Sequence, residues 1–200
     1  MGRSEYGLLP FVELNGEHIA DSQIIINRLS EHFDIKPLPS PRDEAVARAI
    51  DRMVDIHTFL VQYQFKMVDN EDDSFFSNIL RDTGCPQALI PLLVPLMAFM
   101  FRRKAAKRIA AGVGKLSTEN YKELLKKDYD ALQAILGEQK FFFGDHISAV
   151  DCTVFGQLAT TLYLPSSSYC KDVLKEQYPA LVEYCNRIRD TVFGSEFSSE

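Results

Sequence analysis

Hydrophobic and polar positions alternate near the start of the chain and follow a helical period along the rest. The stretch LLPFVELNGEHIADS, residues 8–22, predicts a strand, a tight turn and a second strand that leads into a helix. Large apolar residues then recur four positions apart from Ile25 to Phe33, which predicts an amphipathic helix. We expect Asp21 or Ser22 to cap this helix, because a short polar side chain accepts hydrogen bonds from the free N–H groups of the first turn.

A proline-rich stretch follows this helix. The segment DIKPLPSPRDEA, residues 34–45, contains three prolines, which mark a linker rather than a helix or strand. We therefore predict a domain boundary here, with a first domain at residues 1–36 and a second at residues 37–200.

The second domain has the pattern of an all-helical domain. Ser40, Pro41 and Asp43 fit the N-cap, the first helical position and the acidic N3 position of a capping box. The helix that they begin is predicted to run to about Val68, and later apolar stripes bring the expected total to five to seven helices. The predicted fold class is α+β, mostly α: a β-β-α fragment, a linker and an all-helical domain.

One later segment carries a particularly clear helix start. In FFFGDHISAVDCTVFGQLATTL, residues 141–162, Ile147 fits N′, Ser148 the N-cap and Asp151 the N3 position, which together form a hydrophobic staple and a structural capping box. The helix that follows is apolar or small almost all round, so we predict that it is the buried central helix. Cys152 is accordingly predicted to serve in packing.

Composition narrows the function classes. A net charge of −6 argues against a nucleic-acid binder, which normally presents a basic face. The four cysteines are widely spaced and no secretory leader is recognisable, so we expect a reduced, intracellular and cytoplasmic chain rather than a secreted one. The four histidines lack metal-type spacing with any cysteine, so no metal site is expected, and His57 is predicted to be a hydrogen-bonded core histidine.

The segment ALIPLLVPLMAFMF, residues 88–101, is strongly apolar and is followed by a run of arginines and lysines up to Arg108. It is shorter than the roughly 20 residues that a membrane-spanning helix needs, and it contains two prolines. We favour a buried, proline-kinked helix with a solvated basic end. The alternative is that Ala88 to Arg108 makes peripheral contact with an anionic membrane or with a protein partner.

The order of these elements resembles the glutathione S-transferase fold, which has a thioredoxin-like half, a linker and a helical half. LPFVEL, residues 9–14, resembles the strand opened by the family's cis-proline, here Pro10. ADSQIIINRLSEHF, residues 20–33, resembles the acid-serine start of the next helix, and FFFGDHISAVDCTVFGQLA, residues 141–159, resembles the family's capped central helix.

Within that superfamily the chain resembles the failed axon connections and metaxin-like branch. The stretches GLLPFVELNGEHIADSQIII and RRKAAKRIAAGVGKLSTENY carry this resemblance. The branch is linked to axon development and, for the metaxins, to import at the mitochondrial outer membrane. The resemblance therefore implies an interaction or scaffold role, with mitochondrial outer-membrane association as an alternative to a cytoplasmic location.

The superfamily resemblance also implies a place for glutathione as a ligand or co-substrate. The backbone of Leu9, before Pro10, would pair with the peptide like one more strand. Ser22 would bind the γ-glutamyl carboxylate and Asp21 the α-ammonium group, helped by the helix N-terminus. The alternative is that Asp21 and Ser22 only cap a helix and that Pro10 only ends a loop.

A thioredoxin-like half begins with a strand, a helix and a strand ahead of the cis-proline, whereas only MGRSEYGLL precedes Pro10. The Tyr, Ser or Cys that activates the glutathione thiol in transferases belongs to that segment. We therefore expect no catalytic residue in this chain. The remaining strands would lack their sheet partners, so we expect the chain to be a fragment, a truncated form, or a protein that completes its sheet with a partner or a second copy. The alternative is a glutathione-dependent transferase or peroxidase whose catalytic N-terminal segment is absent from this sequence.

Overall fold

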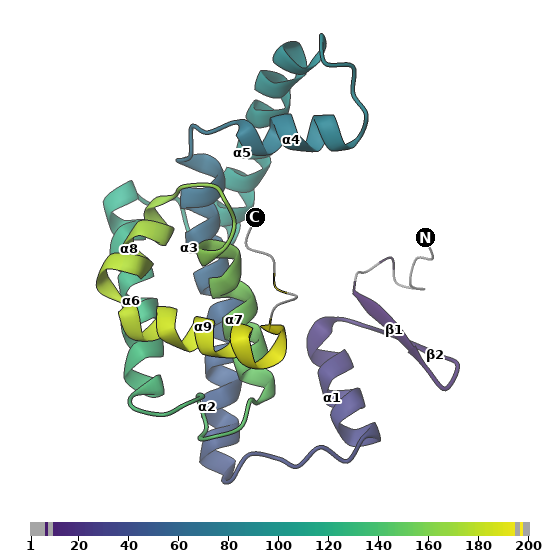
Figure 1. Ribbon diagram of the computed structural model, residues 1–200, viewed down its shortest axis with the longest axis vertical. Coiled ribbons are helices and arrows are strands. Elements are labelled where there is room, and N and C mark those ends of the chain that lie inside the picture. The colour runs from purple at the N-terminus through teal and green to yellow at the C-terminus, as the bar shows by residue number, and fades with distance from the viewer. Residues whose placement is uncertain (1–6, 8–9, 195–196, 198–200) are drawn as a thin grey trace. The chain divides into compact units, whose positions relative to one another are not determined.

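The structure is a computed structural model that describes residue 7, residues 10–194 and residue 197. The chain divides into two compact units, Met1–Ala45 and Val46–Glu200, whose α-helices and β-strands are labelled in Figure 1. This division falls inside helix α2 (Pro41–Arg52), whereas the sequence places the domain boundary near residue 36, which stays a prediction.

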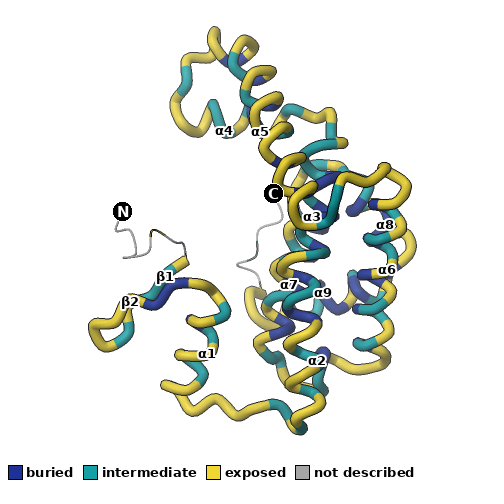
Figure 2. The backbone as a smooth tube through the Cα atoms, turned by 180° about the vertical axis from the view of Figure 1, so that it is seen from behind, coloured by how far each residue is buried: buried dark blue, intermediate teal, exposed yellow. Residues whose placement is uncertain are grey.

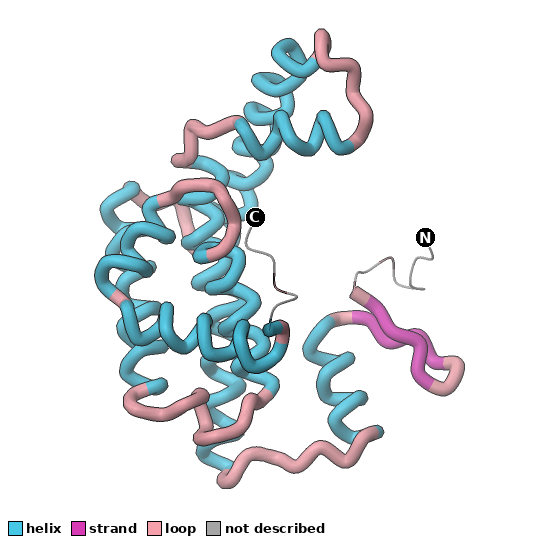
Figure 3. The backbone as a smooth tube through the Cα atoms, in the orientation of Figure 1, coloured by secondary structure: helices cyan, strands magenta, loops and turns pink. Residues whose placement is uncertain are grey.

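The first unit contains a β-hairpin and one helix (Figure 3). Strands β1 (Phe11–Leu14) and β2 (Glu17–Ala20) pair antiparallel, and α1 (Ser22–His32) follows directly. The two turn residues, Asn15 and Gly16, have φ angles of 52° and 85°, as a tight hairpin turn between twisted strands requires. The predicted strand, turn, strand and helix are therefore confirmed.

One continuous helical stretch from Pro41 to Val68 leads from the first unit into the second. It comprises α2, a π-helical segment η1 (Met53–Thr58), α3 (Phe59–Tyr63) and a second π-helical segment η2 (Gln64–Val68). The Ser40 hydroxyl accepts a hydrogen bond from the backbone N–H of Asp43 at 3.1 Å, so the helix begins at the predicted cap.

The remaining helices of this unit are α4 (Ser74–Asp82), α5 (Ile90–Gly112), α6 (Thr118–Leu136), α7 (Ala149–Leu162), α8 (Tyr169–Gln177) and α9 (Pro179–Val192). Among its most deeply buried side chains are Leu125 and Tyr129 of α6, Leu158 of α7 and Tyr184 of α9. Figure 2 shows buried segments, in dark blue, on several helices of this unit. The mostly helical fold class is confirmed.

The structure corrects the favoured interpretation of residues 88–101. Only one face of α5 is buried there, where Ile90, Val94 and Ala98 pack with Phe76 of α4 in a small separate cluster. Leu92 is 73 % exposed, and the other large apolar residues on that side are exposed as well. The pattern showed an apolar helix but not its neighbours. Helix α4 and Met67 of η2 pack against this part of α5 and bury one side of it.

The prediction for Cys152 was also wrong, because this residue is exposed. Helix α7 buries Val150, Asp151, Val154 and Leu158, which lie on one side of the helix. Cys152 projects from the other side, since successive residues are about 100° apart around a helix. An almost uniformly apolar sequence therefore does not mean that every side of the helix is covered.

Candidate functional site

The hairpin brings the two sequence motifs of the first unit to one end of the strands. The register pairs Phe11 with Ala20, so Pro10 and Asp21 occupy the next position outward on each side. Pro10, Asp21 and Ser22 are all exposed. The structure thus groups three of the four residues predicted to bind glutathione, and the fourth, Leu9, lies outside the described residues.

Asp21 has an unusual backbone conformation, with φ 76° and ψ 122°. A positive φ is uncommon for a residue with a side chain and indicates a local constraint. The Asp21 Oδ1 atom accepts hydrogen bonds from the N–H groups of Gln23 at 3.0 Å and Ile24 at 3.3 Å, so Asp21 caps α1. No described residue bonds its second oxygen, Oδ2, which leaves that atom available to a cation beside the helix N-terminus.

The Ser148–Asp151 capping box is an internal support rather than a ligand site. Asp151 is 0 % exposed and accepts hydrogen bonds at Oδ2 from the Ser148 N–H at 2.8 Å and the Ser148 hydroxyl at 2.6 Å. Its Oδ1 atom accepts from the Phe142 N–H and the Tyr184 hydroxyl, both at 3.0 Å. One carboxylate therefore holds the start of α7, the preceding loop and α9 together.

Comparison with known proteins matches both ends of the chain to one group of domains. The family model of the glutathione S-transferase N-terminal domain matches residues 1–72, and that of the glutathione S-transferase C-terminal domain matches residues 125–188. The two matches occur in the order that the fold requires.

The chain belongs to the glutathione S-transferase-like superfamily.

Two relatives show how far the similarity extends within this superfamily. Failed axon connections of Drosophila melanogaster is 32 % identical over 204 residues, which cover 96 % of this chain and 48 % of that protein. Isoprene-epoxide–glutathione S-transferase of Rhodococcus sp. (strain AD45) is 26 % identical over 193 residues, which cover 93 % of this chain and 78 % of that protein. This chain spans about half the length of Failed axon connections. No solved structure matches this chain.

An Asp–His pair in the second unit of this transferase-like chain was not predicted. The Nδ1 atom of His57, in η1, lies 2.8 Å from Asp128 Oδ2, which also accepts a hydrogen bond from the Thr58 hydroxyl at 2.6 Å. The His57 side chain is 34 % exposed and that of Asp128 is 8 % exposed. His57 is hydrogen-bonded, as predicted, but at the rim of the core, with its Nε2 edge unbonded among the described residues.

Two buried thiols of this unit are poorly suited to nucleophilic chemistry. Burial raises the pKa of the Cys185 thiol to about 12 and also raises that of Cys170. The thiolate is the reactive form, so both groups remain protonated and unreactive near neutral pH. Among the described residues, no cluster of three or more His, Cys, Asp or Glu side chains could hold a metal ion.

Lys66 provides a pH-dependent test of the second unit. Burial lowers the pKa of its ammonium group from 10.5 to about 8, and its Nζ atom donates to the Thr160 hydroxyl at 3.2 Å. The unfolded chain therefore binds more protons than the folded chain between about pH 8 and 10.5, and stability rises with pH across this window. We expect Lys66→Met to increase the free energy of unfolding by about 1 kcal/mol at pH 7, allowing for partial exposure.

The increase in the free energy of unfolding should disappear as the pH rises past 10.5, because Lys66 is then neutral in both the folded and the unfolded chain. Urea unfolding of Lys66→Met and the unmodified chain at several pH values measures the difference. Lys175→Met, at an exposed position on α8, is the matched control. A gain independent of pH would show that packing of the methionine, and not loss of a buried charge, is responsible.

Proposed function

We propose that this chain binds glutathione through its first unit and acts as an interaction or scaffold protein, without conjugating glutathione to other molecules. One observation carries the binding part: Asp21 is held at φ 76° at the N-terminus of α1, beside Pro10 and with Ser22 exposed. Backbone strain of this kind persists where the surrounding structure maintains it, and it is concentrated at ligand sites.

The chemistry of the proposed site matches the γ-glutamyl end of glutathione, which carries a carboxylate and an ammonium group. The hydroxyl of Ser22 and the N–H groups at the start of α1 would bind the carboxylate, where the helix dipole favours negative charge. Asp21 Oδ2 would bind the ammonium group, while Oδ1 continues to cap the helix. Capping and ligand binding are therefore compatible at this residue.

The interaction role is supported by similarity to Failed axon connections over 96 % of this chain. The proposed partner is another protein or a second copy of the chain, rather than a nucleic acid, because the net charge is −6. Four free cysteines support a reducing, cytoplasmic location, with mitochondrial outer-membrane association as the alternative.

The second candidate function is that of a glutathione-dependent transferase or peroxidase. Its support is the similarity to Isoprene-epoxide–glutathione S-transferase, which extends over 78 % of that protein and 93 % of this chain. Glutathione binding at Pro10, Asp21 and Ser22 would be common to both functions. Only a measurement of turnover separates them.

Glutathione binding is tested by isothermal titration calorimetry of the unmodified chain and of Ser22→Ala. A hydrogen bond to a charged group is worth about 1.5–3 kcal/mol, so we expect Ser22→Ala to weaken glutathione binding by roughly tenfold or more. Alanine is a good helix former, so α1 should persist. Ser30→Ala, near the other end of the same helix, is the control and should bind as the unmodified chain does. Equal affinity in Ser22→Ala and Ser30→Ala would contradict the site.

Conjugation is tested with glutathione and a chlorinated nitrobenzene or a small epoxide. We expect no turnover above the rate without protein. Turnover at rates ordinary for transferases would reject the scaffold role and support the second candidate. Glutathione binding without turnover is the combination that supports the proposal as a whole.

A further inference from the structure

One face of α5 carries exposed apolar residues in its first half and exposed basic residues in its second half. Leu92, Leu96 and Phe99 are 73 %, 57 % and 61 % exposed, and Arg103 and Lys107 are also exposed. These five positions are three or four residues apart, so they form one continuous stripe along the helix. Met100 and Lys104, each one position further on, widen the stripe and are exposed as well.

The opposite side of α5 is buried against the protein. Ile90, Val94, Ala98, Ala105 and Ile109 are its buried residues, at intervals of four or seven positions. The helix is therefore fixed to the second unit along one side, and the exposed stripe is presented without rearrangement. Burying such large apolar side chains in an apolar environment is favourable by about 25 cal/mol per Å² of surface, so an uncovered group of them indicates an interaction site.

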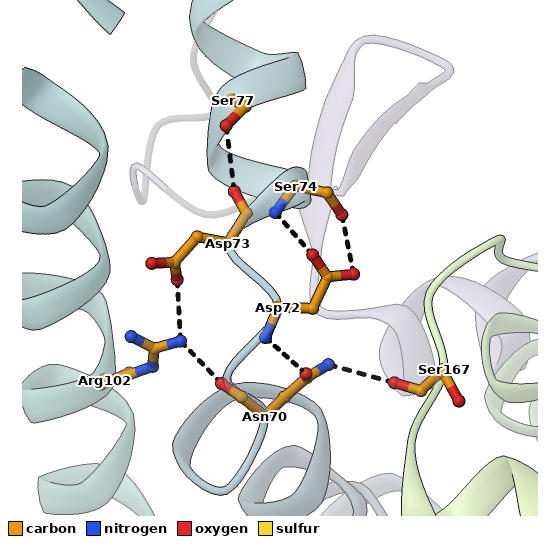
Figure 4. A network of polar contacts seen from close by, with 7 residues as sticks. All are labelled: Asn70, Asp72, Asp73, Ser74, Ser77, Arg102 and Ser167. Atoms are coloured by element: carbon orange, nitrogen blue, oxygen red, sulfur yellow. Dashed lines mark hydrogen bonds and ion pairs between the residues drawn. The ribbon is translucent and has the colours of Figure 1, made fainter. Parts of the chain in front are cut away.

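The nearby acidic loop does not neutralise the stripe. Figure 4 shows that Arg102 is the residue that pairs with this loop: its Nη2 atom donates to Asp73 Oδ1 at 2.7 Å and to the Asn70 carbonyl at 2.6 Å. The loop is further held by the Asn70 side chain, which donates to the Ser167 carbonyl at 3.1 Å. Within the part of the chain that the structure describes, Arg103, Lys104 and Lys107 have no ion-pair partner.

An open pocket of about 420 Å³ lies beside the stripe. Phe99 and Arg103 of the stripe line it, together with Asp73 and Arg102, whose charges compensate each other. The pocket therefore combines an apolar wall with the positive charge of Arg103. These two features suit a lipid with a phosphate-bearing headgroup: the cation would bind the phosphate, and the apolar wall would contact the adjoining carbon chain.

From these features we infer that α5 is the surface by which this chain rests on an anionic lipid membrane. Leu92, Leu96, Phe99 and Met100 would enter the boundary between headgroups and acyl chains, while Arg103, Lys104 and Lys107 bind the phosphates. A basic cluster on a chain of net charge −6 would also orient the molecule, because the remaining surface is repelled by anionic lipid. A second copy of the chain offers no negative surface of its own at this stripe.

The contact is peripheral. Among the described residues, no helix is both long enough and apolar enough to cross a bilayer. Peripheral contacts of this kind weaken with salt and depend on the anionic lipid content of the membrane.

Flotation of the full chain with vesicles tests the inference. We expect binding to vesicles of phosphatidylcholine and phosphatidylserine, and little or none to phosphatidylcholine alone. The affinity for anionic vesicles should fall by roughly fivefold for each cation removed in the triple variant Arg103→Gln, Lys104→Gln, Lys107→Gln. The control variant Lys115→Gln, Lys127→Gln, Lys175→Gln changes net charge equally at exposed positions elsewhere and should bind normally.

The apolar half is tested by fluorescence, because the chain contains no tryptophan. Leu92→Trp introduces one at a position that is 73 % exposed, and its emission should shift to shorter wavelength on anionic vesicles. Leu164→Trp, at a position 51 % exposed in the loop after α7, is the control and should not shift.

Three outcomes would overturn the inference. The first is absence of binding to anionic vesicles, and the second is equal binding by the two triple variants. The third is a dimer, seen by analytical ultracentrifugation, that Leu92→Ser with Leu96→Ser abolishes while vesicle binding is absent. That result would assign the stripe to contact between protein chains.

Discussion

Replacing Asp151 with alanine is expected to lower the free energy of unfolding of the second unit by about 3–5 kcal/mol. The carboxylate is 0 % exposed and satisfies the N–H groups of Phe142 and Ser148 and the hydroxyl of Tyr184. Its removal leaves these buried donors without partners, and each unsatisfied donor costs roughly 1–3 kcal/mol. Urea unfolding followed by circular dichroism measures the loss.

The controls for this prediction separate the network from the cap alone. Ser148→Ala removes the capping hydroxyl but keeps the carboxylate, and should cost only about 1 kcal/mol. Asp145→Ala, in the loop just before α7, replaces an exposed carboxylate and should change stability by less than about 0.5 kcal/mol. If Asp151→Ala were as mild as Asp145→Ala, the buried carboxylate would not hold α7 and α9 together.

The second large effect is expected at Gln62, a polar side chain in α3 that is 0 % exposed. Its Nε2 atom donates to the Tyr129 hydroxyl at 2.9 Å, and its Oε1 atom accepts from Gln157 at 2.9 Å and from the Thr161 hydroxyl at 2.7 Å. We expect Gln62→Met to lower the free energy of unfolding by about 2–4 kcal/mol. Methionine fills a similar volume, so lost hydrogen bonds, and not a cavity, cause this effect.

The measurement is again urea unfolding, with Gln177→Met at the exposed end of α8 as the control. The control should change stability by less than about 0.5 kcal/mol. A small loss in Gln62→Met would mean that water or shifted side chains satisfy the Tyr129 and Thr161 hydroxyls. A double variant with Tyr129→Phe would then show whether the two groups are coupled, since coupled residues do not give additive losses.

Elements set by neighbouring residues were predictable from the sequence. The Asn15–Gly16 turn, the cap at Asp21 and the cap at Ser40 each depend on contacts within about four residues of one another. The family resemblance, and not local geometry, named Pro10, Asp21 and Ser22 as one candidate site, and the register of the hairpin places them at one end of the strands. The starts of α2 and α7 were predictable because apolar spacing and caps agreed there.

Pairings between distant residues were not predictable. His57 and Asp128 are 71 positions apart, and Gln62 and Tyr129 are 67 positions apart, so no spacing rule relates them. The sequence gives the type of each polar side chain but not the helix that it faces. The uncovered side of α5 was missed for the same reason, because the apolar pattern of residues 88–101 is equally consistent with a buried helix and an exposed one.

The sequence by itself determined the order of the elements, the all-helical character of the second unit and the membership of the glutathione S-transferase-like superfamily. The order and type of the elements follow from local hydrogen bonding and periodicity, and the membership follows from the resemblance of motifs and the family-model matches. The tertiary structure alone decided which sides of the helices are covered. It therefore decided that Asp151 and Gln62 are buried supports, that Cys152 is exposed, and that α5 presents an apolar and basic stripe, because burial depends on neighbours that packing brings together.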